Sequence, residues 1–381
     1  MDLFEYQGKM LFAAEAVPVP DGRVAATPAE AEQAARQLGG RVVVKAQVQV
    51  GGRGKAGGIA LADGPDDARA NAERILGMDI KGHTVHRVWV EQASDIAAEY
   101  YVSFTLDRSV KKHMAMVSAQ GGVDIEAVAA ATPDRVVRRH IDPVLGLPAW
   151  QARQLVFAAG LDRGVVGKLV DVLTRLYGAF VHLDCDLVEV NPLITTSAGD
   201  VVALDAKVAL DANAFYRHPD FAEFAKAHDV DPIEAMAKER GLNFIKLSGS
   251  VGIMANGAGL AMSTLDVVDL VGGKAANFLD VGGSANADTI TSALEVLTRD
   301  PDVKSVLINI FGGIVRCDLV AEGVVEALSR LSLPWQLVVR LDGTNAVQGR
   351  RILAASKSDR IVPAATMREA AETAVELAGG S

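Results

Sequence analysis

The pattern of apolar and polar positions changes near Gly241. From Asn243 onward, five short apolar runs each precede an amphipathic stretch of helical length. The runs are VGIMAN, NFLDVGG, SVLINIFGG, WQLVVRLDG and RIVPAA, and the helices are expected at 259–271, 287–298, 318–331, 345–355 and 367–378. Strands that alternate with such helices predict parallel βαβ units with right-handed crossovers. We therefore expect residues 241–381 to form an α/β domain on a doubly wound parallel sheet.

The first 240 residues lack this regular alternation. Amphipathic stretches predict helices at 4–16, 28–38, 66–76, 150–159 and 164–182, and β-branched runs predict strands at 42–47, 85–92, 99–106 and 114–119. Residues 186–210 (DLVEVNPLITTSAGDVVALDAKVAL) predict a hairpin with its turn at 197–200. The pattern favours an α+β region of two subdomains, residues 1–240, whose charged and mostly helical segment 212–240 is a connector.

A cationic, glycine-rich segment follows the strand expected at 42–47. Within GGRGKAGG, residues 51–58, five glycines surround Arg53 and Lys55, although the whole chain carries a formal charge of -10. Glycines let backbone N–H groups approach an anion closely, and cations neutralise it, so the segment suits a polyphosphate. The loop has neither P-loop nor Rossmann spacing, and a basic surface loop is the alternative interpretation.

The hairpin carries a candidate metal site. Asn191 and Asp205 each lie seven residues from Ala198, so a turn centred there sets them opposite one another. Glu189 shares the face of Asn191, because side chains alternate along a strand, and the same count sets it opposite Lys207. Amide and carboxylate oxygens suit Mg²⁺. The alternative is a solvated polar face with a Glu189–Lys207 pair.

Four of the C-terminal strands lead into small or polar residues. These are Asn256-Gly257, Gly282-Gly283, Gly312-Gly313 and Asp342-Gly343. Ligands of open α/β sheets bind outside the carboxyl ends of the strands, and the GGIVRCD segment leads directly into a helix whose free N–H groups suit an anion. Tight strand-to-helix turns need glycine in any case, so each turn alone has a purely structural explanation.

Composition excludes several classes of protein. No apolar run approaches the about 18 residues that span a bilayer, and MDLFEYQGKMLF is not a secretory signal. Two cysteines, Cys185 and Cys317, give no disulfide framework, and the pI of about 5.3 argues against nucleic-acid binding. We expect a cytoplasmic protein, or an organelle-matrix protein if a transit peptide was removed, with no membrane partner.

Six motifs carry a resemblance along nearly the whole chain. GGRGKAGG, VEVNPL, ALDAKV, NGAGLAM, NFLDVGG and NIFGGIVRCD occur here in this order. In them the chain resembles the β subunit of succinate–CoA ligase (succinyl-CoA synthetase) of the ADP-forming type. The resemblance implies an N-terminal ATP-grasp region, a C-terminal flavodoxin-like domain, Mg²⁺, and a tricarboxylic acid cycle reaction. In that reaction succinate, CoA and ATP reversibly give succinyl-CoA, ADP and phosphate through a phosphohistidine, with GTP/GDP as an alternative nucleotide pair.

The resemblance also implies roles for individual residues. The nucleotide would be bound by Lys45, Gly52, Arg53, Gly54, Glu91, Ser94 and Glu99. Asn191 and Asp205 would hold Mg²⁺, and Glu189 would orient the phosphohistidine beside the nucleotide. The carboxylate substrate or its phosphate would be contacted by Asn256, Gly313, Ile314 and Val315.

The phosphohistidine is expected on another chain. All seven histidines lie before the doubly wound domain, in helical or charged contexts: His83, His86, His113, His140, His182, His218 and His228. In the family, an α subunit supplies this histidine and the CoA site, in an αβ or α2β2 assembly. Two alternatives remain at this point: a malate–CoA ligase β subunit, and a regulatory nucleotide-binding subunit without catalysis.

Overall fold

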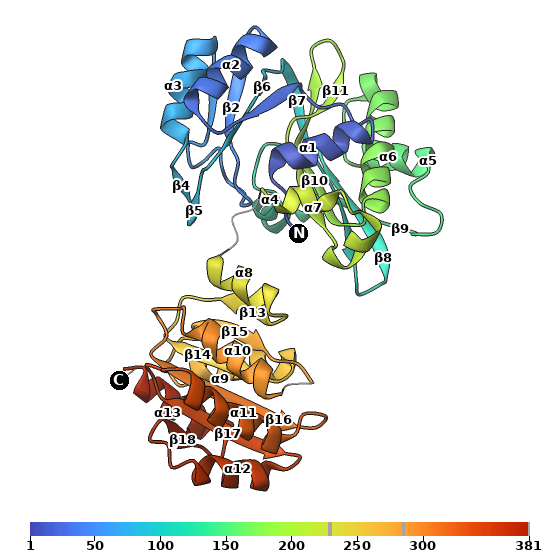
Figure 1. Ribbon diagram of the computed structural model, residues 1–381. Helices are drawn as coiled ribbons and strands as arrows, with labels where there is room; N and C mark the ends of the chain where they lie inside the picture. Colours follow the sequence, from blue (N-terminus) through green and yellow to red (C-terminus); the bar gives the residue numbers. More distant parts are fainter. Residues whose placement is uncertain (228–230, 284–285, 380–381) are drawn as a thin grey trace. The chain divides into compact units, whose positions relative to one another are not determined.

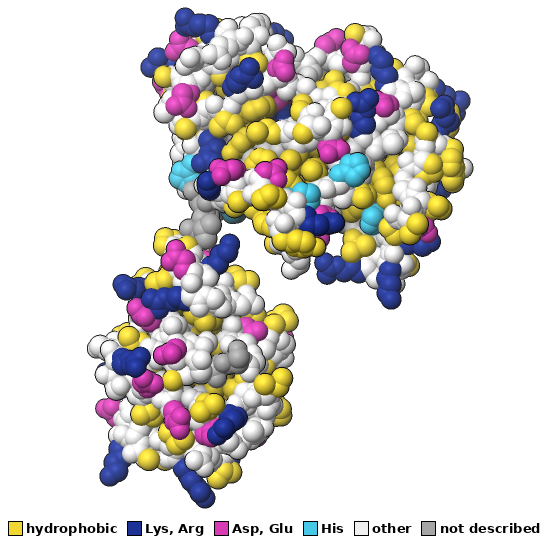
Figure 2. Space-filling model, turned by 45° about the vertical axis from the view of Figure 1, so that its right-hand side comes forward, with side chains coloured by type: hydrophobic (Ala, Val, Ile, Leu, Met, Phe, Trp, Pro, Cys, Tyr) yellow, Lys and Arg dark blue, Asp and Glu magenta, His cyan; other side chains and the backbone are white. Residues whose placement is uncertain are grey.

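The chain forms two compact units, residues 1–227 and 228–381, which are described separately below. The computed structural model describes residues 1–227, 231–283 and 286–379 (Figure 1). Among these residues, no helix combines the length and apolar character that a membrane span requires. On the face drawn in Figure 2, basic and acidic side chains are interspersed on the surface of each unit.

The first sheet of the N-terminal unit is small and antiparallel. Its strand order is β1 (Gly22–Ala25), β6 (Val88–Gln92), β2 (Val42–Ala46) and β3 (Ile59–Ala62). Helices α2 (Pro28–Leu38) and α3 (Pro65–Ile75) cover it, and the two-residue strands β4 (Asp79–Ile80) and β5 (His83–Thr84) pair nearby. Because side chains alternate along a strand, Val42, Val44 and Ala46 all face the buried core.

The second sheet of this unit has the order β11 (Val201–Ala203), β10 (Cys185–Thr196), β7 (Ile96–Asp107), β8 (Lys112–Ser118) and β9 (Val137–Ile141), and β12 (Lys207–Leu210) also pairs with β10. Its core is closed by α1 (Glu5–Ala14), α5 (Ala149–Ala158) and α6 (Val166–His182). Leu169, Leu173 and Leu176 of α6 are fully buried there, at the three- and four-residue spacing of one helix face. The short α4 (Ile125–Ala131) has its own small apolar cluster.

The C-terminal unit is a doubly wound sheet, as predicted. Its strand order is β13 (Asn243–Lys246), β15 (Asn277–Asp280), β14 (Val251–Ala255), β16 (Ser305–Gly312), β17 (Leu337–Gly343) and β18 (Ile361–Pro363). The last five are the five predicted strands, and they pair in parallel. Numbered along the chain from β14, their order is 2-1-3-4-5, the flavodoxin-like arrangement.

Helices cover both faces of this sheet. Val306, Ile308 and Ile310 of β16 face the core formed with α10 (Ala287–Leu297), α11 (Cys317–Arg330) and α12 (Ala346–Ala355). Leu307, between them, faces the opposite core with α9 (Ala258–Leu270) and α13 (Met367–Leu377). Both faces are therefore buried, which explains why the strand reads as a continuous apolar run.

The elements that the sequence did not predict are short or peripheral. They are β1, β3, β4, β5, β9, α4 and the antiparallel edge strand β13. Segment 212–240 contains a short 3₁₀ helix (Ala212–Arg217), α7 (Phe221–Ala225) and α8 (Pro232–Glu239). The helix α8 packs on the second unit, where Ala237 joins the core, so the predicted connector is shared between the units.

Two glycines approach each other where β16 and β17 end, and they give a test of this fold. Gly343 has φ +85°, and a Cβ there would lie 2.2 Å from the carbonyl oxygen of Gly312. We expect Gly343→Ala to lower the free energy of unfolding by about 1–3 kcal/mol or more, as measured by urea denaturation. Gly259→Ala is the matched control, because a Cβ there meets nothing within 4 Å. Equal loss in both variants would contradict the close packing at these strand ends.

Candidate functional site

The glycine-rich segment is the connection between β2 and β3, which pair as an antiparallel hairpin. Gly52 has φ +89°, a conformation that favours glycine, and short turns within the loop bond Gly57 N to Gly54 O and Gly58 N to Arg53 O. The loop turns Arg53 back toward the sheet, where its guanidinium donates to the carbonyl of Ala46 at 3.2 Å. Arg53 is therefore an ordered, buried cation, and Gly52 and Gly54 lie exposed beside it.

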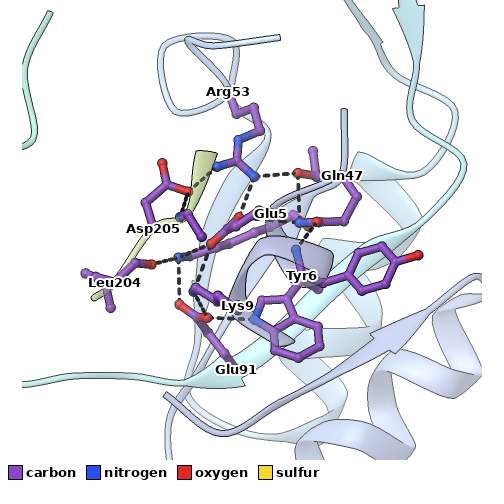
Figure 3. Close-up of polar contacts among 12 residues, drawn as sticks. Glu5, Tyr6, Lys9, Gln47, Arg53, Glu91, Leu204 and Asp205 are labelled. Carbon is purple, nitrogen blue, oxygen red and sulfur yellow. Dashed lines mark hydrogen bonds and ion pairs between the residues drawn. The ribbon is translucent and has the colours of Figure 1, made fainter. Parts of the chain in front are cut away.

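Lys45 and Arg53 meet a cluster of buried carboxylates (Figure 3). Lys45 Nζ lies 3.0 Å from Glu5 Oε1 and 2.6 Å from Glu91 Oε1, and it donates to the carbonyl of Leu204 at 2.8 Å. Arg53 pairs with Glu5 Oε2 and, at 2.7 Å, with Asp205 Oδ1. These contacts join α1, the first sheet and the segment between β11 and β12 of the second sheet.

Glu91 is the most deeply buried carboxylate of this cluster. Its carboxylate is fully buried, accepts from Trp89 Nε1 at 2.7 Å, and pairs with Lys9 as well as Lys45. Lys9 also lies 2.9 Å from Glu5, one helical turn away on α1. The structure therefore brings Glu91 to Lys45, as a partner of that cation, with no oxygen exposed to solvent.

The cluster contains equal numbers of charges of each sign. Lys9, Lys45 and Arg53 oppose Glu5, Glu91 and Asp205. Burial alone would raise the pKa of Glu5, but the three cations hold that pKa well below its usual range. Burial alone would lower the pKa of Lys45, but the charges of Glu5, Glu91 and Asp205 raise that pKa above its usual value. The ion pairs thus favour the charged forms of Glu5 and Lys45 despite their burial.

The hairpin has the predicted register. Leu193 pairs with Ala203 and Glu189 with Lys207, on either side of the positions of Asn191 and Asp205. Pairing is interrupted between them at the cis Asn191–Pro192 bond. Asn191 Oδ1 accepts from the backbone N–H of Gly122 at 2.8 Å, whereas Asp205 accepts from Arg53 and is about one-quarter exposed.

Glu189 is mostly buried beside Tyr101. Burial raises the pKa of Glu189 above its usual range; Lys207, 3.9 Å away, opposes this, and the carboxylates of Glu126 and Asp205 add to it. Burial also raises the pKa of the Tyr101 hydroxyl, as does the charge of Glu189. Glu189 therefore lies near two other carboxylates, Glu126 of α4 and Asp205 of the hairpin.

These oxygens fit a magnesium ion that is completed by water and phosphate. Asp205 offers a partly exposed carboxylate, Asn191 offers an amide oxygen, and three carboxylates repel one another in the same region. Mg²⁺ commonly takes one or two carboxylates and keeps the rest of its shell for water and phosphate. Within the described ranges, no group of three or more His, Cys, Asp or Glu side chains forms a complete metal site by itself.

Ser94 lies in the segment that connects the two sheets of the first unit, and Glu99 lies near the start of the second sheet. Ser94 lies between β6 and β7, and Glu99 is exposed on β7. The carboxylate of Glu99 lies near Gly122, because a Cβ at Gly122 would come within 2.7 Å of Glu99 Oε2. Gly122 in turn bonds to Asn191, so Glu99 and Asn191 lie on either side of one glycine turn.

The substrate residues predicted in the second unit lie at its topological switch point. Asn256 follows β14 and Gly313 follows β16, the two strands between which the order of the sheet reverses. The amide of Asn256 bridges this gap: its oxygen accepts from Phe311 N at 2.8 Å and its nitrogen donates to Phe311 O at 2.9 Å. Ligands of doubly wound sheets bind at this position.

The loop after β16 has no polar side chain from Gly313 to Val315. The side chain of Ile314 is 92% exposed, that of Val315 is buried in the core, and Gly313 has no side chain. At the start of α11, Cys317 N donates to the carbonyl of Thr344 at 3.0 Å. Asp318 pairs with Arg316, whose hydrogen bond lowers the pKa of Asp318 to about 2. The site therefore has a cation, Arg316, whose charge is matched by a neighbouring carboxylate.

Sequence reasoning missed four residues that shape the first site: Glu5, Lys9, Trp89 and Glu126. A usable signal was the four-residue spacing of Glu5 and Lys9 in α1, a helix in which Leu11 and Phe12 pack into an apolar core. Glu126 and the turn at Gly121–Gly122 lie in GGVDIE, residues 121–126.

The histidines of the described residues have structural partners or surface positions. His113 bonds to the Tyr177 hydroxyl at 2.9 Å, and His140, His182 and His218 pair with carboxylates. His83 is exposed on β5. His228 lies outside the described residues.

Comparisons with known proteins define the class. Residues 2–195 match the ATP-grasp domain family, and residues 254–375 match the CoA-ligase family. The fold of the whole chain is shared with ATP citrate lyase from Methanothrix soehngenii, at 20% identity and a TM-score of 0.77 over 98% of this chain and 99% of that one. It is also shared with ATP citrate lyase of Methanosaeta concilii, at 19% identity and a TM-score of 0.75 over 99% of both chains.

A closer relative gives the family. The succinate–CoA ligase [ADP-forming] subunit beta of Rubrobacter xylanophilus is 49% identical over 378 residues, which cover 99% of each chain. The chain therefore belongs to the family of ADP-forming succinate–CoA ligase β subunits. The fold class expected from the sequence is confirmed: an ATP-grasp region followed by a flavodoxin-like CoA-ligase domain.

The buried ion pairs of Lys9 predict a large effect on stability. Lys9→Met leaves Glu5 and Glu91 buried with one cation fewer, so we expect a loss of about 3–5 kcal/mol in the free energy of unfolding. The control is Lys226→Met, which removes an exposed pair with Glu223 and should cost less than about 1 kcal/mol. Urea denaturation of both variants measures the difference, and similar small losses would show that the cluster does not need its third cation.

Proposed function

We propose that this chain is the nucleotide-binding β subunit of a succinate–CoA ligase. The assembled enzyme would interconvert succinate, CoA and ATP with succinyl-CoA, ADP and phosphate. The observation that carries the proposal is the 2.7 Å contact between Arg53 and Asp205. It sets a phosphate-binding cation beside a metal-binding carboxylate, where a metal-bound polyphosphate needs both. Malate specificity and a purely regulatory role are not favoured, because the family relative is a succinate enzyme and this chain contains Lys45, Glu189, Asn191 and Asp205 together.

In this proposal the N-terminal unit binds the nucleotide. Lys45 and Arg53 would donate charge-assisted hydrogen bonds to phosphate oxygens, and the backbone of Gly52 and Gly54 would approach those oxygens closely. Glu91 would act through Lys45, Ser94 would flank the nucleotide from the segment between the sheets, and Glu99 would flank it from β7. Asn191 and Asp205 supply oxygen ligands to Mg²⁺, which neutralises charge on the transferred phosphoryl group when bound.

Glu189 receives the histidine of an α subunit. A carboxylate with a raised pKa, close to the metal ligands, can accept a hydrogen bond from an imidazole N–H and fix the ring orientation. The other ring nitrogen then attacks the γ-phosphorus, and the bond from that phosphorus to the β–γ bridging oxygen breaks, which releases ADP. The charge-assisted hydrogen bond also stabilises the ring as it becomes cationic.

The second unit receives the phosphorylated histidine and succinate. Backbone N–H groups of the segment from Gly313 to Val315 are suited to oxyanions, and Asn256 holds the opposite side of the switch point in place. A succinate carboxylate oxygen would attack the phosphohistidine, forming succinyl phosphate and freeing the ring. The CoA thiol would then displace phosphate. The α subunit would supply the histidine and CoA site, in an αβ or α2β2 assembly.

Asp205→Asn tests the metal assignment. The variant keeps the shape of the side chain and removes its charge, so we expect Mg²⁺-dependent binding of ADP to weaken at least about tenfold while the protein stays folded. Isothermal titration of Mg·ADP, with circular dichroism as the folding control, measures both. Asp200→Asn is the control, because Asp200 lies on the same hairpin as Asp205 but forms only an exposed ion pair, with Lys168 of α6. Wild-type Mg·ADP affinity in Asp205→Asn would contradict the assignment.

Glu189→Gln tests the phosphoryl relay. In the assembled enzyme, labelling of the α-subunit histidine from γ-labelled ATP should slow at least about a hundredfold, because the orienting carboxylate is lost. Transfer from an already phosphorylated α subunit to succinate should change much less, since Asn256 and Gly313 belong to the other unit. Equal slowing of both half-reactions would contradict the assignment of Glu189 to phosphoryl transfer from the nucleotide. Acyl-CoA synthesis by this chain alone would overturn the relay and the subunit assignment together.

A further inference from the structure

Glu5, the first residue of α1, is the buried carboxylate on which three cations converge. Its Oε1 lies 2.9 Å from Lys9 Nζ and 3.0 Å from Lys45 Nζ, and its Oε2 pairs with Arg53. Gln47 Nε2 also lies 3.4 Å from Oε2. Figure 3 shows the Glu5 carboxylate with Lys9 on one side and the Arg53 guanidinium on the other.

Each oxygen of Glu5 therefore holds one of the two cations assigned to phosphate. Lys45 comes from β2, and Arg53 comes from the glycine loop that follows it. Within the described part of the chain, Glu91 forms an ion pair with Lys45 but not with Arg53, and Asp205 forms one with Arg53 but not with Lys45. Among the described residues, Glu5 is thus the carboxylate that forms ion pairs with both.

The position of Glu5 fits a support rather than a ligand. Its side chain is almost completely buried, and Lys9 neutralises it from within the same helix. A lysine or arginine side chain has many rotamers, and ordering them before binding improves affinity because the entropy is already lost. A bidentate carboxylate between two flexible cations supplies that order.

We propose that Glu5 is a positioning residue for the nucleotide polyphosphate. Its carboxylate sets the spacing of Lys45 Nζ and the Arg53 guanidinium without touching the nucleotide itself. The inference rests on the proposed function and adds to it a residue from the N-terminal helix. It assigns α1 a part in nucleotide binding, besides its part in closing the core of the second sheet.

Two substitutions separate position from charge. Glu5→Gln keeps the length and removes the charge, whereas Glu5→Asp keeps the charge and withdraws the carboxylate by about 1.5 Å. Both should weaken Mg·ADP binding by about tenfold to a hundredfold, because each loses charge-assisted contacts that order the cations. Both should raise the KM for ATP and leave the KM values for succinate and CoA unchanged.

The measurements use the full chain assembled with its α subunit, with calorimetry for Mg·ADP and steady-state kinetics for the three substrates. Glu15→Gln is the matched control: Glu15 caps the C-terminal end of the same helix and pairs with the surface residue His182. It should behave as the wild type in every measurement. Thermal unfolding of each variant separates binding from stability.

Several results would overturn the proposal. If Glu5 contributed only its negative charge, Glu5→Gln would bind Mg·ADP more tightly and Glu5→Asp would match the wild type. If it were only structural, melting temperatures would fall while the folded protein kept its ADP affinity. Failure of the wild-type enzyme to bind Mg·ADP is a separate outcome, which would overturn the proposed function and with it this inference.

Discussion

The ion-pair cluster of Glu5, Lys9, Lys45, Arg53, Glu91 and Asp205 is the interaction on which the N-terminal unit depends. Isolated buried charges are costly, so each of these groups can be buried only while its partners are present. The partners come from α1, from the two central strands of the first sheet and the loop that follows one of them, and from the segment between β11 and β12 of the second sheet. The contacts that hold the two sheets together are therefore the same contacts that hold Lys45 and Arg53 in place.

Charge balance also explains why a metal ion belongs with the nucleotide in the proposed function. The three cations are already matched by three carboxylates, so a polyphosphate adds negative charge that the cluster by itself does not neutralise. Glu189 and Glu126 add negative charge nearby; burial is the main cause of the raised pKa of Glu189, and the charges of Glu126 and Asp205 raise it further. In the proposed function, a divalent cation held by Asn191 and Asp205 would supply positive charge that the cluster lacks.

The sequence predicted most of the fold because hydrophobic periodicity is a local property. All five parallel strands of the second unit and the register of the hairpin, including Glu189 opposite Lys207, were readable in this way. The cluster was not. Glu5 and Arg53 are 48 positions apart, and Arg53 and Asp205 are 152 apart, so no local pattern links them. A glutamate in an amphipathic helix also normally indicates a solvent-facing position, and here tertiary packing overrides that expectation.

The two units organise their sites by different means. In the first, charged side chains hold one another, so a single lost charge affects several partners at once. In the second, neutral contacts hold part of the site: Asn256 bonds to the backbone of Phe311 at the switch point, and Gly312 and Gly343 meet without side chains where β16 and β17 end. Main-chain amides keep their dipoles at any pH, whereas carboxylates lose their charge when they are protonated. In the proposed function, an oxyanion site of this kind would accept succinate and a phosphorylated histidine in turn, because main-chain donors keep the same geometry for both anions.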